Sequence, residues 1–138
     1  MRFNQETDYA LRMVLAFSRL DAGSFLTALE ISDKNHIPYR FLLRVAKKLK
    51  KAGIVVSRQG PDGGFRLAKP AGDISYLDVI EAVEGEININ RCLRDSSLCN
   101  AGNAPECAVH QSLRDIQDAF RRELRRKHFG GQGARPDE

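Results

Sequence analysis

The sequence predicts a mainly α-helical protein with one small β-hairpin, and three observations support this fold class. Apolar residues recur at helical spacing in several separate stretches. Two short β-type runs flank a glycine-rich turn, and a long charged segment near the C-terminus carries a narrow apolar stripe. At 138 residues, the chain has room for one compact domain and one further element.

The first two helices are predicted from apolar density and from capping residues. Residues 7–20 are apolar enough for a helix that is buried over most of its surface. Thr27 is followed three residues later by Glu30, a capping-box pattern in which the hydroxyl and the carboxylate each satisfy a free backbone amide. We therefore expect a short second helix from Ala28 to Lys34.

A third helix is predicted between Pro38 and Gly53. Proline suits a first helical turn because its missing amide hydrogen costs nothing there, and glycine suits the position after a helix end. Two β-type runs, residues 54–58 and 65–69, follow around the glycine-rich turn 60–64 and predict a hairpin. Two short helices followed by such a hairpin predict a winged helix-turn-helix.

The C-terminal half continues with a helix from Ser75 to Gly85, a loop with cysteines, and a long helix. The narrow apolar stripe on the long helix indicates contact with another helix, either within the chain or, as we favour, in a homodimer. The stripe consists of Val109, Leu113, Ile116, Phe120 and Leu124. The expected organisation is a winged helix-turn-helix domain (1–85), a cysteine loop (86–106), a dimerisation helix (105–127) and a disordered tail (128–138).

Positive charge is concentrated in one part of the chain. The net charge is +4, yet from Lys34 to Arg58 there are eight basic residues and no Asp or Glu. Such a cluster suits the phosphate backbone of double-stranded DNA, because each contact releases counterions from the nucleic acid. A solvated basic face is the alternative explanation for the charge cluster alone.

Within the predicted winged helix-turn-helix, the third helix is the element that enters the major groove. Its first residues are the candidates for base contacts, since an arginine can donate two hydrogen bonds to guanine. Its later lysines are placed to contact phosphates, and the hairpin residues are placed to contact phosphates or the minor groove. The candidates are, in this order, Tyr39, Arg40, Leu43 and Arg44; Lys47, Lys48 and Lys51; and Arg58, Gln59 and Arg66.

Other function classes find little support in the sequence. No Ser-His-Asp set, phosphate-binding loop or pair of catalytic carboxylates is recognisable, so neither an enzyme nor a small-molecule substrate is expected. No apolar run approaches the roughly 20 residues needed to cross a bilayer, and no signal peptide is recognisable. We expect a cytoplasmic protein without a membrane partner.

Three cysteines fall within one short stretch. Cys92, Cys99 and Cys107 are separated by six and seven residues, and His110 follows three positions after Cys107. An odd number of cysteines argues against a disulfide framework, and zinc sites favour cysteine pairs at closer spacing. Three thiolates with one other ligand fit an iron-sulfur cluster, while a zinc site and incidental buried cysteines are the alternatives.

Four segments carry a resemblance to a known family: residues 1–12, 37–55, the hairpin 60–67 and the cysteine loop. Together they resemble the IscR/NsrR/RirA family of bacterial winged-helix transcription regulators, over residues 1 to about 127. The resemblance implies a homodimer with crossing long helices, and an iron-sulfur cluster that controls operator binding. It implies a repressor of iron-sulfur cluster biogenesis genes; nitric oxide response, iron supply and cysteine metabolism are the family's other roles.

The resemblance leaves two candidates for the fourth cluster ligand. His110 occupies the position of the histidine that completes a [2Fe-2S] cluster in IscR proteins, and Asp8 matches the aspartate that the partner subunit supplies to a [4Fe-4S] cluster in NsrR proteins. We favour His110 and [2Fe-2S], because imidazole is the better iron ligand and lies near the cysteines in sequence. Otherwise, Asp8 is a helix cap or a surface acid.

Two positions depart from the IscR pattern. Leu43 stands where IscR proteins have an acidic residue in the recognition helix, and Gln59 stands where they have an arginine. The operator sequence therefore does not transfer to this chain. Two rival classes remain: a small iron-sulfur redox protein, and a zinc-stabilised DNA-binding protein that senses nothing.

Overall fold

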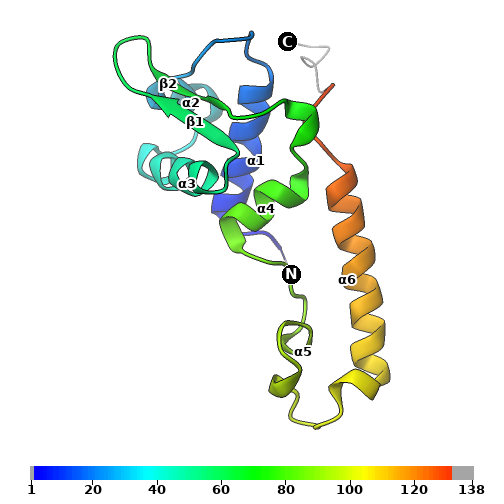
Figure 1. Ribbon diagram of the computed structural model, residues 1–138. Coiled ribbons are helices and arrows are strands. Elements are labelled where there is room, and N and C mark those ends of the chain that lie inside the picture. Colours follow the sequence, from blue (N-terminus) through cyan, green and yellow to red (C-terminus); the bar gives the residue numbers. More distant parts are fainter. Residues whose placement is uncertain (1, 132–138) are drawn as a thin grey trace.

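The computed structural model describes residues 2–131 as a compact head from which a long arm extends (Figure 1). The arm runs down from the head and returns to it, with its short helical turns at the far end. The head consists of α1 (Gln5–Ser18), α2 (Ala28–Asn35), α3 (Tyr39–Lys51), β1 (Val55–Arg58), β2 (Gly64–Leu67), η1 (Ala71–Asp73) and α4 (Tyr76–Glu84). The arm consists of α5 (Arg91–Arg94), η2 (Ser96–Leu98), η3 (Ala104–Glu106) and α6 (Ala108–Arg126).

This element order confirms the mainly α-helical fold with one hairpin. The predicted capping box is present at the start of α2, and Ser75 and Asp78 form a second one at the start of α4. The first helix begins at Gln5, two residues before the predicted start, because the Asn4 side chain accepts a hydrogen bond from the Thr7 backbone amide at 2.8 Å. The last helix begins at Ala108, and Pro105 lies in the separate turn η3.

The antiparallel hairpin gains a third segment from the loop before α2. Val55 pairs with Leu67 and Arg58 with Gly64 in the hairpin, and Leu26 forms an isolated bridge with Phe65 on the free edge of β2. A Cβ atom on Gly64 would lie 2.3 Å from the Leu26 carbonyl oxygen. Glycine is therefore required at this position, because only the absence of a side chain allows the two backbones to approach.

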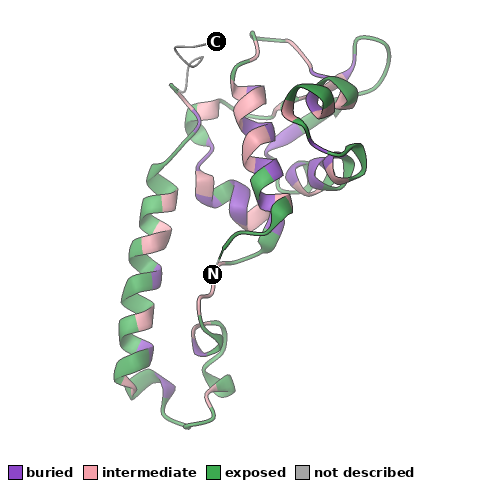
Figure 2. Cartoon of the chain, turned by 180° about the vertical axis from the view of Figure 1, so that it is seen from behind, coloured by how far each residue is buried: buried purple, intermediate pink, exposed green. Residues whose placement is uncertain are grey.

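The core of the head lies where α1 packs against α3 and α4 (Figure 2). Each of the three helices turns one apolar face inward and leaves polar residues outside, which is the pattern of amphipathic surface helices. The fully buried apolar side chains in these helices are Ala10, Met13, Val14, Leu42, Val45, Leu49, Val79 and Ile80. The α6 helix is largely exposed along its length.

Residues 128–131 pack against the head, so the expectation of a disordered tail from His128 is wrong for this part. Phe129 is 1% exposed and stacks on Tyr76 with ring centroids 4.6 Å apart. The backbone pairs as well, because Tyr76 N donates to the Lys127 carbonyl at 2.8 Å and His128 forms a bridge with Ser75. Residues 132–138 of the predicted tail lie outside the described residues.

Among residues 2–131, no helix combines the length and the apolar character needed to cross a membrane. The longest helix, α6, carries charged side chains along most of its surface.

Replacing Phe129 by alanine tests whether the returning chain holds the head together. We expect Phe129→Ala to lower the free energy of unfolding by about 3 kcal/mol, because a fully buried aromatic side chain is lost and a cavity remains. The same substitution at Phe3, which is 41% exposed, serves as the control and should have a smaller effect. Urea unfolding followed by circular dichroism measures both, and equal losses would contradict the role of Phe129.

Candidate nucleic-acid interface and cysteine loop

The α3 helix presents its predicted DNA-contacting residues on the face opposite to the core. Leu42, Val45, Ala46 and Leu49 are buried on the inner face. Tyr39 and Leu43 are 46% and 44% exposed, although both are large apolar or aromatic side chains. The basic side chains on this outer face are Arg40, Arg44, Lys47 and Lys51, which are exposed, and Lys48, which is half-buried.

The hairpin, which contains the three predicted wing residues, lies on the same side of the molecule as α3 (Figure 1). Arg58, Gln59 and Arg66 are all exposed. Because Arg58 and Arg66 both alternate with inward-facing residues of their strands, they share the outer face of the hairpin. The structure thus places the two elements that carry the predicted residues, α3 and the hairpin, on one side of the head.

Both hairpin arginines lie over Phe25, a residue that the sequence did not single out. The guanidinium carbons of Arg58 and Arg66 are 4.2 Å and 4.7 Å from the centre of its ring. The bridge between Leu26 and Phe65 explains this position, because the neighbour of an inward-facing residue points to the outer face. The contact is long-range, so no local sequence signal connects Phe25 with the hairpin.

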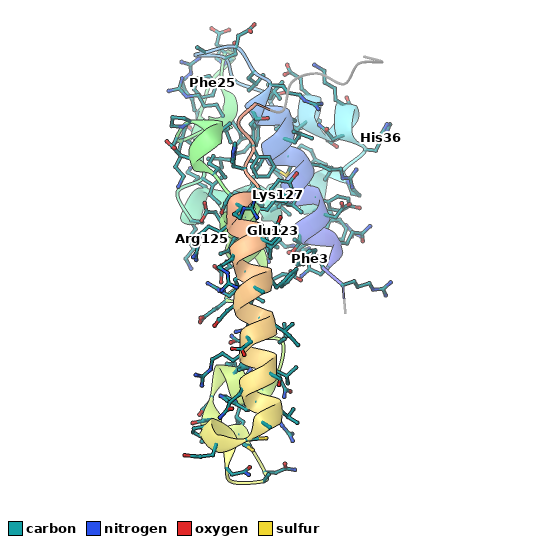
Figure 3. All side chains as sticks on the ribbon, turned by 90° about the vertical axis from the view of Figure 1, so that its right-hand side faces the viewer. Phe3, Phe25, His36, Glu123, Arg125 and Lys127 are labelled. Atoms are coloured by element: carbon teal, nitrogen blue, oxygen red, sulfur yellow. The ribbon has the colours of Figure 1, made fainter. Side chains whose placement is uncertain are left out.

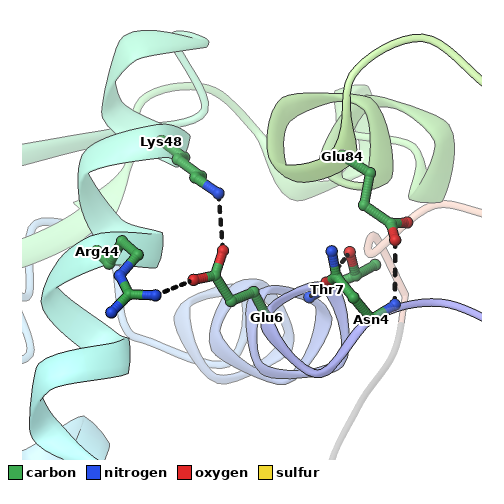
Figure 4. Close-up of polar contacts among 6 residues, drawn as sticks. All are labelled: Asn4, Glu6, Thr7, Arg44, Lys48 and Glu84. Carbon is green, nitrogen blue, oxygen red and sulfur yellow. Dashed lines mark hydrogen bonds and ion pairs between the residues drawn. The ribbon is translucent and has the colours of Figure 1, made fainter.

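A second residue missed by the sequence analysis, Glu6, binds two of the predicted DNA-contacting cations (Figure 4). Its carboxylate oxygens accept hydrogen bonds from Arg44 Nη1 at 2.9 Å and from Lys48 Nζ at 2.7 Å. The hydrogen bond from Lys48 lowers the pKa of Glu6; partial burial opposes this shift and the hydrogen bond from Arg44 reinforces it. Glu6 therefore remains ionised at neutral pH.

The N-terminal turn of α1 holds Glu6 in place. The Asn4 side chain caps the helix through the Thr7 amide and hydroxyl, at 2.8 Å and 2.9 Å. The backbone amide of Asn4 donates to Glu84 of α4 at 3.0 Å (Figure 4). The helix start is thereby fixed to α4 on one side, while Glu6 reaches α3 on the other.

The α6 arm packs on its own chain along only part of its surface. Arg121 of α6 forms an ion pair with Glu81 of α4 at 2.7 Å, and the side-chain oxygen of Gln117 accepts a hydrogen bond from the Ile89 amide at 2.7 Å. Two residues of the predicted apolar stripe, Val109 and Ile116, are 63% and 58% exposed. Figure 3 shows side chains projecting into solvent along the length of the arm.

The stripe is therefore divided between two environments. Phe120 is half-buried against Phe3, with ring centroids 6.3 Å apart. Leu113 and Leu124 are also half-buried. Packing within the chain accounts for these three stripe residues, and it leaves Val109 and Ile116 uncovered.

Cys92 lies in α5, Cys99 directly follows η2, and Cys107 lies between η3 and α6; none of the three forms a disulfide. Cys92 is buried in α5, where its sulfur accepts a hydrogen bond from the Asn90 side chain at 3.5 Å. Backbone amides, first of Ala101, then of Asn103 and Gly102, lower the pKa of Cys99 because they stabilise its thiolate. Cys107 is the N-cap residue of α6.

His110 lies in the first turn of α6 and is 5% exposed. Its Nε2 atom is 2.9 Å from Nη2 of Arg114. Since a guanidinium only donates hydrogen bonds, Nε2 accepts, and in the neutral ring the proton is then on Nδ1. Nδ1 is buried and has no hydrogen-bond partner among the described residues.

The three cysteines and His110 all lie in the arm, but they are not assembled into a site. α5 contacts both η2 and α6, and η2 contacts η3, so the cysteines and His110 belong to neighbouring elements. Within residues 2–131, however, no three His, Cys, Asp or Glu side chains lie close enough to hold one metal ion. Asp8 lies on α1 in the head, where it pairs with Arg12 at 3.0 Å as a surface acid.

The donor chemistry nevertheless suits an iron-sulfur cluster. Three free thiols, one of them stabilised as thiolate, are the usual ligands of such centres. The buried Nδ1 atom of His110 has no hydrogen-bond partner among the described residues, so ligation at this nitrogen would displace no partner of its own. Because these groups do not meet at one point among the described residues, cluster binding would require the loop to rearrange locally and bring them together.

Comparisons with known proteins agree on one class. The profile of the Rrf2 family, described as an iron-dependent transcriptional regulator, matches residues 3–130. The transcriptional regulator IscR of Cronobacter sakazakii is 30% identical over 118 residues, which are 86% of this chain and 71% of that protein.

Solved structures show the same fold. CymR, the global cysteine regulator of B. subtilis, superimposes with a TM-score of 0.76 at 22% identity, covering 94% of this chain and 93% of that one. IscR of T. potens superimposes with a TM-score of 0.71 at 18% identity, covering 94% and 83%. At such identities, the two structures confirm the winged helix-turn-helix architecture with its long C-terminal helix.

The ion pairs of Glu6 predict a pH-dependent contribution to stability. At neutral pH, Glu6→Gln should lower the free energy of unfolding by about 0.5 kcal/mol, as for other partly exposed ion pairs. Because the native pKa is lowered, this stabilisation is present above the ordinary pKa of the carboxyl group and is lost as the pH falls through the native pKa. Urea unfolding of both proteins from neutral to acidic pH measures the difference, and a constant difference would contradict this origin.

Proposed function

Because the chain belongs to the Rrf2 family of transcriptional regulators, we propose that it binds double-stranded DNA through α3 and the hairpin, under the control of an iron-sulfur cluster on its cysteine loop. The relatives are DNA-binding transcription regulators and not enzymes. The observation that carries the proposed interface is the arrangement of the head: the helix with exposed basic residues and the glycine-turn hairpin with its two exposed arginines lie on the same side of it.

In this proposal, the N-terminal half of α3 contacts base edges in the major groove. Arg44 donates to guanine, and Tyr39, Arg40 and Leu43 contact neighbouring bases. The α3 lysines and the hairpin residues contact the backbone or the minor groove, which fixes the position of the head on the duplex. These contacts come from Lys47, Lys48, Lys51, Arg58, Gln59 and Arg66.

We assign the exposed side of α6 to a homodimer. Val109 and Ile116 are large apolar side chains that the chain's own packing leaves exposed on one long helix. A second copy of α6 would cover them and would carry a second head, so that one dimer contacts two DNA half-sites. The separation of the two heads then depends on how the two arms pack.

The proposed cluster ligands are Cys92, Cys99 and Cys107, with His110 as the fourth ligand of a [2Fe-2S] centre. A bound cluster would supply a centre that is sensitive to oxidation and to iron supply. The amides around Cys99 favour its thiolate, and Cys107 joins the loop directly to α6. Ligation through Nδ1 of His110 would move the ring proton to Nε2 and end its contact with Arg114. Asp8 with a [4Fe-4S] cluster is the alternative.

For the regulated genes, we propose repression of iron-sulfur cluster biogenesis. Support comes from the curated relatives named IscR, at 30% identity. The CymR fold is equally similar in shape, so fold alone does not separate this role from control of cysteine metabolism, iron supply or the nitric oxide response. DNA selection with the purified protein, followed by mapping of the selected sequence onto its genome, tests the assignment.

Two alanine substitutions on α3 separate base contacts from phosphate contacts. Arg44→Ala should change the sequence preference found by DNA selection, because a donor pair to a base is lost. Lys47→Ala should weaken binding to all duplexes alike and reduce the dependence of log K on log salt by about 0.9. If both variants lost affinity equally on every sequence, Arg44 would not belong to the base-contacting set.

Anaerobic reconstitution with iron and sulfide tests the cluster. We expect a coloured protein whose visible spectrum is lost in Cys99→Ala and changed in His110→Ala, while Asp8→Ala leaves it unaltered. Glu106→Gln, next to Cys107 but outside the proposed ligand set, is the matched control and should keep the spectrum. A protein that stays colourless would refute the cluster, and loss of the spectrum in Asp8→Ala alone would transfer the fourth ligand to Asp8.

A further inference from the structure

We propose that Glu6 limits non-specific DNA binding by neutralising part of the cationic face of α3, and so raises the preference for specific sites. This inference rests on the proposed DNA interface. Its basis is that one carboxylate of α1 binds both Arg44 and Lys48, at 2.9 Å and 2.7 Å. The other two lysines of the proposed phosphate contacts on α3, Lys47 and Lys51, form no ion pair with any described residue.

The position of Glu6 makes it a fixed countercharge. Its side chain is 14% exposed, and it belongs to a helix start held by the Asn4 cap and by the hydrogen bond to Glu84. Its hydrogen bonds to Lys48 and Arg44 lower the pKa of Glu6 and so favour the charged carboxylate. With Arg44 and Lys48 it forms a group of net charge +1 instead of +2.

Non-specific affinity depends almost entirely on such charges. Each cation that neutralises a phosphate contributes about 0.9 to the slope of log K against log salt. The Glu6 carboxylate lies 2.7 Å from the Lys48 ammonium nitrogen. A phosphate that approaches Lys48 therefore also approaches this carboxylate, and the repulsion between the two anions offsets part of the attraction. Glu6 therefore reduces sequence-independent binding by up to the contribution of one cation–phosphate contact.

Specific contacts by Arg44 are less affected. Glu6 binds only Nη1, and the Arg44 side chain remains 55% exposed with its guanidinium 5.2 Å above the Phe41 ring. Nε and Nη2 of Arg44 form no hydrogen bond with Glu6, so both can donate to a base. Glu6 therefore weakens the attraction to every duplex but leaves hydrogen-bond donors of Arg44 for the bases of the specific site. This raises the ratio of specific to non-specific affinity.

The test compares Glu6→Gln with the wild-type protein on two duplexes of equal length, one of random sequence and one obtained by DNA selection. Fluorescence anisotropy over a series of salt concentrations gives affinity and salt slope. We expect Glu6→Gln to bind the random duplex about two- to fivefold more tightly, with a slope steeper by up to about one, and to discriminate less between the duplexes. Asp73→Asn, the same charge change on exposed η1, is the control and should show no gain.

A Lys48→Met/Arg44→Met background shows whether Glu6 acts through its two partners. The effect of Glu6→Gln should largely disappear there, because the cations that it neutralises are gone. Unchanged or weaker binding by Glu6→Gln, while the wild type binds with normal salt dependence, would overturn the inference and leave the DNA interface intact. A wild-type protein that does not bind DNA at low salt would overturn both.

Discussion

The packing of α1 across both α3 and α4 is the contact on which the other features of the head depend. Its inner face, with Met13 and Val14 fully buried, sets the position of the helix whose outer face carries the basic residues. The same helix delivers Glu6 to α3 and is tied to α4 by the bond between Asn4 and Glu84. Core packing and the electrostatics of the basic surface therefore originate in one element.

The hairpin shows how backbone pairing places charged side chains. Because Leu26 pairs with Phe65, the preceding Phe25 lies on the outer face beneath Arg58 and Arg66. A guanidinium over an aromatic ring keeps its charge available while its orientation is restricted. Both arginines are thus held in place before any partner arrives, which reduces the entropy lost on binding.

Local signals were sufficient for most of the fold. Capping residues fix the starts of α2 and α4, and Gly85 ends α4, because each acts within a few residues of itself. The burial of Phe129 and the contacts of Glu6 were missed because both depend on residues distant in sequence. Phe129 follows charged residues and precedes glycines, yet it is buried on Tyr76, and Glu6 lies 38 residues from Arg44. The cysteine spacing identifies candidate ligands but not their arrangement, since that depends on the path of the loop between them.

The route of the arm has a mechanical consequence. The chain leaves α4 at Gly85, runs through the cysteine loop and α6, and returns to the other end of α4, where His128 pairs with Ser75. Residues 85–128 therefore form one long excursion of the chain whose two ends both lie at α4, one at each end of that helix. Because α4 is also packed against α1 and α3, a rearrangement of the cysteine loop that shifted either end of residues 85–128 would act on α4 and, through it, on the helix that carries the basic surface.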